Sequence, residues 1–361
     1  MKHVTLTMLM ALIVSFSLNA NTIQPIIFDD PTFDIHSSGL SAEQRSFFHQ
    51  YIYAIDRINA GEDAEKYLVM ERTDDADQIV VAPLLGAINF DQGRPYNNHC
   101  PYINGGRAVT GCVATAMAMV MRYYNFPAKG TGTVKYTGGS EGEQTFVLDD
   151  HPFDWANILP TYEDGNYNQQ QADAVANLML ACGAALTMNY SKDGSGAKTE
   201  RVPGLLKNNF FFNKEVRYID VSTSSDPELD ITYWGEDVVR PDLELGRPLI
   251  FAGYPAIGQT GHCFVIDGYM IKNGLYYYHV NWGWGGAGNS WCLLTRLQDN
   301  DGNNYSGHNL SMVYFIHPNN QQAIEQTEAD KNVRATKELR NGQVVIIRNN
   351  RVYSVQGQRI E

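Results

Sequence analysis

The stretch "CVATAMAMVMRYY", residues 112–124, constrains the fold more than any other part of this 361-residue chain. Its apolar side chains recur at helical spacing, and the first charge arrives only at Arg122. Thr110 is the expected N-cap residue, and Pro127 marks the stop. A helix this apolar is buried on most sides, so the sequence predicts that the rest of the chain packs around it.

The single cysteine at the start of this helix, Cys112, has two interpretations at this stage. Free cysteine is among the most buried residue types, which favours a packing role. The free backbone amides and the dipole at a helix N-terminus, however, favour a thiolate, which is the nucleophilic form.

The first residues of the chain have the layout of a secretory signal peptide. A short basic start is followed by an apolar run, Val4 to Leu18, and by small residues that end at Ala20. The apolar run is short for a membrane anchor. We therefore expect residues 1–20 to be removed and the protein to be exported. The five cysteines then leave at least one thiol unpaired in an oxidising compartment.

Charge and cysteine spacing exclude several classes of function. The net charge of −13 argues against a nucleic-acid binder, because phosphate contacts need a basic surface. The cysteines form no Cys-x-x-Cys zinc pattern, so we expect no metal, and no organic cofactor is implied.

Residues 21–76 are predicted to form a separate N-terminal piece. A capping box, Ser41 to Gln44, precedes apolar side chains at helical spacing, and Gly61 ends the pattern. This helix must cover something, and both a core position and a pro-segment on the main domain are compatible with it.

Residues 77–318 mix a helical candidate, Gln171–Leu186, with a strand-rich stretch, Val265–Trp284, which favours an α+β fold. The polar stretch 319–336 is an expected linker. Residues 337–361 hold two short β-type runs that predict a hairpin. This tail either packs on the domain or serves export or attachment to the cell envelope.

A second chemical element lies far downstream of Cys112. His262 follows a glycine-rich turn at the start of a predicted strand, and "HVNWGWGG" supplies Asn281 and two tryptophans. In the order Cys, His, Asn, an imidazole takes the thiol proton, and a third group orients the ring through its other nitrogen.

The motifs "TGCVATAMAMVMRYYNFPAKGTG", "FDWANILPTY", "GHCFVIDGY" and "HVNWGWGG" occur in one order between about Val80 and Pro318. In these motifs the chain resembles the streptopain family of secreted bacterial cysteine peptidases. The resemblance implies a two-lobed papain-like fold, with a helical lobe and an antiparallel sheet lobe, and protein or peptide substrates. It also implies a pro-segment, and residues 21–76 are shorter than the pro-segments usual in the family.

The same resemblance assigns roles by position. Cys112 would be the nucleophile, His262 the general base and Asn281 the residue that orients the imidazole. Trp282 would shield that contact from water. Gln92, in "NFDQGRPYN", would donate its amide to the oxyanion together with the backbone N–H of Cys112.

The hairpin between His262 and Asn281 offers an internal check. A tight turn at Asn273-Gly274 with regular pairing would set Asn281 opposite Ile266, roughly 13 Å along the strand from His262. We therefore expect the hairpin to be centred nearer residues 271–272, through a wider loop or a bulge. Cys263 should point away from the site, because adjacent strand residues face opposite sides.

Three functions remain from the sequence. The first is a secreted cysteine endopeptidase that is made as a zymogen and works through a thiolate acyl-enzyme. The second is a thiol amidase or transpeptidase of cell-wall peptides. The third is an exported surface-binding protein with an inactive site.

Overall fold

The computed structural model describes residues 39–62, 77–139, 142–221, 227–319, 336–340, 343–348 and 351–354. The predicted signal peptide and most of the predicted linker lie outside these ranges, as do residues 21–38 and 63–76 of the N-terminal piece. Within the described part of the chain, no helix combines the length and apolar character needed to cross a bilayer.

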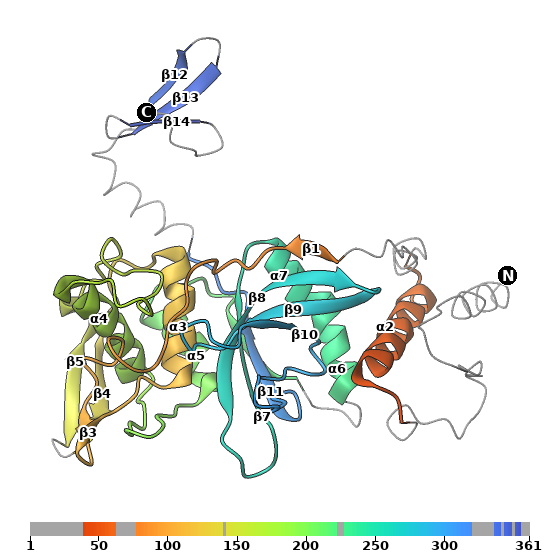
Figure 1. The fold of residues 1–361 in the computed structure, drawn as a ribbon, viewed down its shortest axis with the longest axis horizontal. Coiled ribbons are helices and arrows are strands. Elements are labelled where there is room, and N and C mark those ends of the chain that lie inside the picture. The colour runs from red at the N-terminus through yellow and green to blue at the C-terminus, as the bar shows by residue number, and fades with distance from the viewer. Residues whose placement is uncertain are drawn as a thin grey trace.

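The first lobe is built around the predicted apolar helix, α3 (Cys112–Tyr124). Every side chain from Val113 to Met121 is buried, and α4 (Gln169–Ala185) packs beside it. Both helices match the sequence predictions. In Figure 1, α3 lies between α4 and the strands of the large sheet. The smaller elements here are β2 (Tyr102–Ile103), β3 (Gly106–Arg107), β4 (Thr133–Thr137), β5 (Glu143–Val147), η4 (Leu148–Asp150), η5 (Thr199–Arg201) and α5 (Val202–Asn208).

The second lobe is a seven-stranded antiparallel sheet. Its order is β10-β9-β8-β7-β11-β6, with β1 paired to β8. The strands are β1 (Gln78–Val81), β6 (Arg217–Asp220), β7 (Leu249–Tyr254), β8 (His262–Lys272), β9 (Leu275–Asn281), β10 (Ser290–Cys292) and β11 (His308–Tyr314). The helical elements α6 (Pro227–Trp234), η6 (Gly235–Val239) and α7 (Arg240–Glu244) accompany it. The expected α+β class is confirmed.

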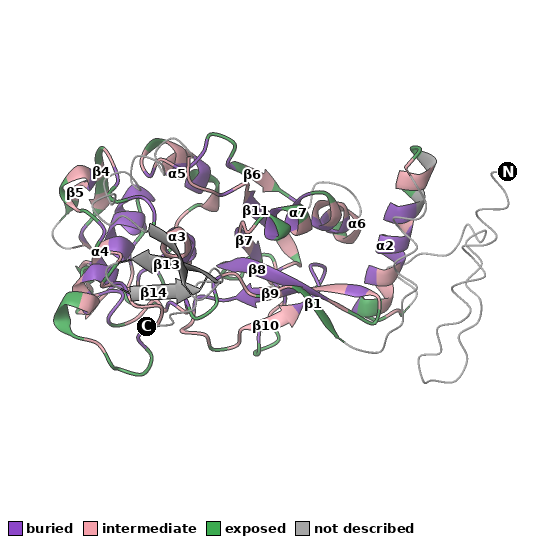
Figure 2. Ribbon diagram, turned by 90° about the horizontal axis from the view of Figure 1, so that it is seen from above, coloured by how far each residue is buried: buried purple, intermediate pink, exposed green. Residues whose placement is uncertain are grey.

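Strand β8 is the element that joins the two lobes. Cys263 and Val265 belong to the core cluster of the helical lobe, whereas Phe264 and Ile266 belong to the cluster that includes residues of η6 and α7. This alternation follows from the two-residue period of a strand. Because both faces are apolar, β8 is buried along most of its length, as Figure 2 shows. The beginning of β8 therefore lies where the two cores meet.

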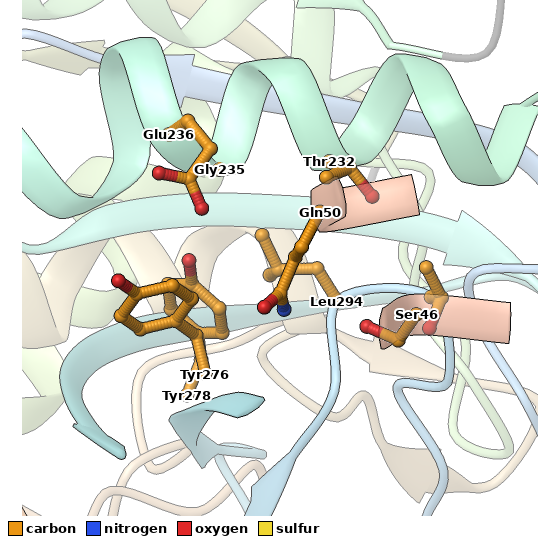
Figure 3. A pocket seen from close by; sticks show the side chains of 9 residues that line it. Ser46, Gln50, Thr232, Gly235, Glu236, Tyr276, Tyr278 and Leu294 are labelled. Carbon is orange, nitrogen blue, oxygen red and sulfur yellow. The ribbon is translucent and has the colours of Figure 1, made fainter. Parts of the chain in front are cut away.

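The described part of the N-terminal piece is α2 (Ala42–Asn59), which begins at the expected capping box of Ser41 and Gln44. It packs on α6 and β9. Arg45 pairs with Glu228 at 2.9 Å, and the Tyr53 hydroxyl donates to Asp237 at 2.8 Å. A small pocket between α2, η6 and β9 is shown in Figure 3. In Figures 1 and 2, α2 lies at the opposite end of the sheet lobe from α3.

The C-terminal residues form a separate three-stranded antiparallel sheet of order β12-β13-β14. Its strands are β12 (Thr336–Arg340), β13 (Gln343–Arg348) and β14 (Arg351–Ser354). The last two coincide with the β-type runs in the sequence. The third strand, β12, was not predicted, and it begins at residue 336, the last residue of the predicted linker.

Candidate active site

The start of α3 is shaped by Gly111, which is its N-cap residue with φ of 88°. A Cβ at this position would lie 2.8 Å from the Met188 side chain and 3.0 Å from the Ser195 carbonyl. The prediction of Thr110 as N-cap was wrong, because its hydroxyl instead contacts the Thr115 hydroxyl at 2.8 Å. Since no side chain caps the helix, its first amides stay available around Cys112.

The Cys112 side chain lies against the beginning of β8. Burial raises the pKa of the thiol, while the backbone amides of Cys263 and Val113 lie near the sulfur and oppose that rise. Because Cys263 directly follows His262, the Cys112 thiol and the backbone of His262 both lie at the beginning of β8. The residue is half-buried, in contact with the helical-lobe core.

The His262 ring is held by one hydrogen bond and by aromatic packing. Its Nε2 lies 2.8 Å from the carbonyl oxygen of Trp282. A carbonyl only accepts, so Nε2 carries the proton and Nδ1 is the basic nitrogen of the neutral ring. The ring stacks on Trp284, with centroids 4.6 Å apart and planes at 25°. Burial lowers the pKa of His262 to about 4.

The hairpin that carries Asn281 differs from the expectation. Lys272 pairs directly with Leu275, so Asn273 and Gly274 form a tight two-residue turn, and the predicted centre at residues 271–272 was wrong. The expected irregularity is nevertheless present, because the register shifts between Ile266 and Gly268. Asp267 is the extra residue of this bulge.

The bulge decides where the Asn281 side chain points. It sets Asn281 opposite Val265, and directly paired residues share a face. Val265 faces the helical lobe, whereas the aromatic neighbours of His262 belong to the other core. The Asn281 amide accordingly donates to the Ile88 carbonyl at 2.9 Å. The structure contradicts the predicted contact of Asn281 with His262, and the Trp282 carbonyl takes that place.

Trp282 and Trp284 both lie beside the His262 ring, whereas only Trp282 was expected to shield it from water. Trp282 is fully buried, and its indole N–H donates to the Gly288 carbonyl at 2.9 Å. Its ring lies 6.2 Å from that of His262, so the closer cover comes from Trp284. Trp284 was not predicted as a site residue, although its position two residues after Trp282 in "NWGWGG" is a signal that could have identified it.

Gln92 lies beside the chain that leads into α3. Its carbonyl accepts the backbone N–H of Thr110 at 3.1 Å, and its own N–H donates to Asp91 at 2.6 Å. The backbone of the predicted oxyanion segment is thus tied to a residue two positions before Cys112.

All five cysteines are free thiols in the structure. Cys263 does not point away from Cys112, contrary to the expectation. It is buried in the helical-lobe core that Cys112 also contacts, and burial together with the charge of Cys112 raises its pKa. The described residues contain no group of three or more His, Cys, Asp or Glu side chains that could hold a metal ion.

A thiol at the N-terminus of a buried helix, beside the backbone of a strand that begins with a histidine, is the arrangement of a thiol peptidase site on a papain-like fold. Comparison with known proteins makes the assignment specific. Residues 90–292 match the Peptidase C10 family, and the chain belongs to that family.

The relatives agree with this assignment. The chain is 35% identical over 244 residues to streptopain of Streptococcus pyogenes, which covers 62% of this chain and 58% of streptopain. It is 34% identical over 213 residues to the thiol protease/hemagglutinin PrtT of Porphyromonas gingivalis, covering 58% of this chain and 23% of PrtT. The chain thus spans little more than half of the length of streptopain.

Solved structures confirm the papain-like α+β fold. Active interpain A, a cysteine protease of Prevotella intermedia, matches with a TM-score of 0.57 and 33% identity, covering 65% of this chain and 95% of that one. A mutant prointerpain A fragment matches with a TM-score of 0.54 and 30% identity, covering 78% of this chain and 86% of that one. The resemblance to the streptopain family is therefore confirmed.

Proposed function

We propose that the protein is an exported cysteine endopeptidase that cleaves proteins or peptides through an acyl-enzyme on Cys112. The observation that carries the proposal is the position of the Cys112 thiol near the backbone N–H of Cys263, the residue that follows His262 at the start of β8. Membership of the Peptidase C10 family and the likeness to an active cysteine protease support it.

The neutral forms of the two groups define the starting state. Burial raises the pKa of Cys112 and lowers that of His262, so each group alone favours its uncharged form. Transfer of the thiol proton to Nδ1 of His262 creates two opposite charges at once, and their attraction in a poorly solvated site offsets much of the cost. The amides at the start of α3 add a favourable field for the sulfur anion.

The reaction then follows from these positions. The Cys112 thiolate attacks the scissile carbonyl, and the oxyanion accepts hydrogen bonds from the Cys112 backbone N–H and the Gln92 side-chain amide. His262 gives its proton to the leaving amine, which departs as the acyl-enzyme forms. Water then loses a proton to His262 and attacks the thioester, which releases the acid and restores the thiol.

Zymogen formation is a further part of the proposal. The match to a prointerpain A fragment supports it, since that match covers more of this chain than the active enzyme does. The described helix of the N-terminal piece, α2, lies on α6 and β9. We infer that α2 anchors the pro-segment to the sheet lobe. Inhibition of the active site would then depend on other residues of the 21–76 segment.

The test is the release of new amino termini from a denatured, unstructured protein substrate. Wild-type protein is expected to generate them, and Cys112→Ala and His262→Ala proteins of unchanged fold are expected to generate none. Hydrolysis or transfer confined to short cell-wall peptides would favour the amidase or transpeptidase instead. Equal cleavage by wild-type and Cys112→Ala protein would refute the proposal.

A further inference from the structure

The loop between β10 and β11 lies directly against His262. On β7, the strand partner of His262 is Gly253, and a Cβ there would come within 1.9 Å of the Tyr305 carbonyl. The Tyr305 ring packs 5.5 Å from the His262 ring at 51°. A glycine on the neighbouring strand therefore lets this loop approach the imidazole.

The Tyr305 hydroxyl leads from the imidazole to a buried carboxylate. It donates to Asp299 Oδ2 at 3.2 Å, and Asp299 is only 7% exposed. The loop fixes the same carboxylate through the backbone N–H groups of Asp301 and Asn303, at 3.0 and 2.8 Å, and through the Asn303 side chain at 2.9 Å.

Asp299 is ionised at neutral pH. Burial alone would raise the pKa of its carboxyl, but hydrogen bonds from Asn303 and Tyr305 outweigh that effect and lower it. The carboxylate is thus a fixed negative charge that accepts a hydrogen bond from Tyr305, the ring packed against His262.

The electrostatic surroundings of His262 give this charge a purpose. Burial lowers the pKa of His262, and two weaker effects oppose it: the hydrogen bond to the Trp282 carbonyl and, after it, the negative charge of Asp299. The stacked rings of Trp282 and Trp284 bring no charge, and the Trp282 carbonyl is neutral. The charge of Cys112 also acts on Tyr305, so the thiol and Asp299 both lie close to this tyrosine.

We propose that Asp299 is a positioning residue that stabilises positive charge on His262, with Tyr305 as the packing and hydrogen-bonding group that holds it in place. This inference rests on the proposed peptidase function. Because the Asn281 side chain bonds elsewhere, Asp299 supplies the support for the imidazolium that Asn281 was expected to give. A carboxylate already fixed by the loop needs no reorganisation when the charge develops.

The experiment measures the rate at which iodoacetamide alkylates Cys112 as a function of pH, with no peptide substrate. The basic limb of this profile reports the loss of the imidazolium proton. Asp299→Asn is expected to move that limb to lower pH by about half a unit to one unit, the size expected of one partly screened charge at this range. Asp299→Glu keeps the charge and is expected to leave the limb in place, even if it lowers the melting temperature.

Asp301→Asn is the matched control, because it removes an exposed carboxylate from the same loop and should leave the limb unchanged. The inference is overturned if Asp299→Asn leaves the limb where the wild-type protein has it, or if Asp299→Glu shifts it as far as Asp299→Asn. If Cys112 of the wild-type protein were instead alkylated with the pH dependence of an isolated thiol, the proposed function itself would be contradicted.

Discussion

Replacing Asn281 with alanine separates two accounts of this site. In the structure its side chain joins β9 to the segment before the Gln92 turn. It donates to the Ile88 carbonyl at 2.9 Å and to Asn89 Oδ1 at 3.2 Å, and it accepts from the Gly283 N–H at 3.2 Å. The residue is 1% exposed, so water does not replace these partners.

The expected loss follows from these contacts. Each hydrogen bond contributes about 1 kcal/mol, and a buried group left without a partner adds about 1–3 kcal/mol. Because the Ile88 carbonyl and the Gly283 N–H both lose their partner, Asn281→Ala should lower the free energy of unfolding by about 2–4 kcal/mol. Asn166→Ala, at an exposed loop position, should change it by less than about 0.5 kcal/mol.

The assay is urea unfolding in a Cys112→Ala background, which prevents self-digestion, together with the alkylation profile in the Cys112 protein. We expect a lower stability and a basic limb at the wild-type pH, since the His262 acceptor is the Trp282 carbonyl. Wild-type stability combined with a basic limb moved to lower pH would refute this reasoning. It would show that Asn281 supports the imidazolium after all.

Three further predictions follow from named contacts. Gly253→Ala should lower the free energy of unfolding by at least about 1–3 kcal/mol, because its Cβ would meet the Tyr305 carbonyl. The control Gly204→Ala meets no atom within 4 Å and should be neutral or stabilising. Equal unfolding midpoints of the two variants in urea would contradict this prediction. Asp237→Asn should weaken the docking of α2 and speed its tryptic cleavage, because Asp237 contacts Tyr53 and Arg57 of that helix. The alkylation rate of the active-site thiol should stay unchanged, and a several-fold change in that rate would place α2 at the active site. His262 has a pKa of about 4 in the fold against 6.5 for an exposed histidine, so the unfolded chain binds more protons between these two pH values. About 3 kcal/mol of the free energy of unfolding should therefore be lost as pH falls through this window. Urea titrations of His262→Gln should lack this component, and a pH dependence identical to that of the wild-type protein would refute it.

The elements that were predictable from the sequence are those defined by the spacing of their own residues. The unbroken apolar run before Arg122 could only be a buried helix, and the capping box at Ser41 marked the start of α2. The expected positions of Cys112 at the start of a helix and of His262 at the start of a strand agree with α3 and β8. These features depend on local spacing, which a sequence displays directly.

The contacts around His262 were not predictable in the same way. The bulge at Asp267 changes which face Asn281 occupies, and nothing in the residue types of the hairpin marks that shift. Asp299 lies 37 positions after His262 in a polar loop, and its significance depends on the packing of Tyr305 against the strand. Backbone carbonyls such as that of Trp282 are equally hidden, because every residue carries one.

The central claim is that Cys112 is an activated nucleophile because His262 takes its proton. Mass spectrometry after treatment with an epoxide-type thiol inhibitor tests it most directly. We expect one label per molecule, at Cys112, and a large fall in labelling rate in His262→Ala protein. Labelling spread over the other thiols, or an equal rate without the imidazole, would contradict it.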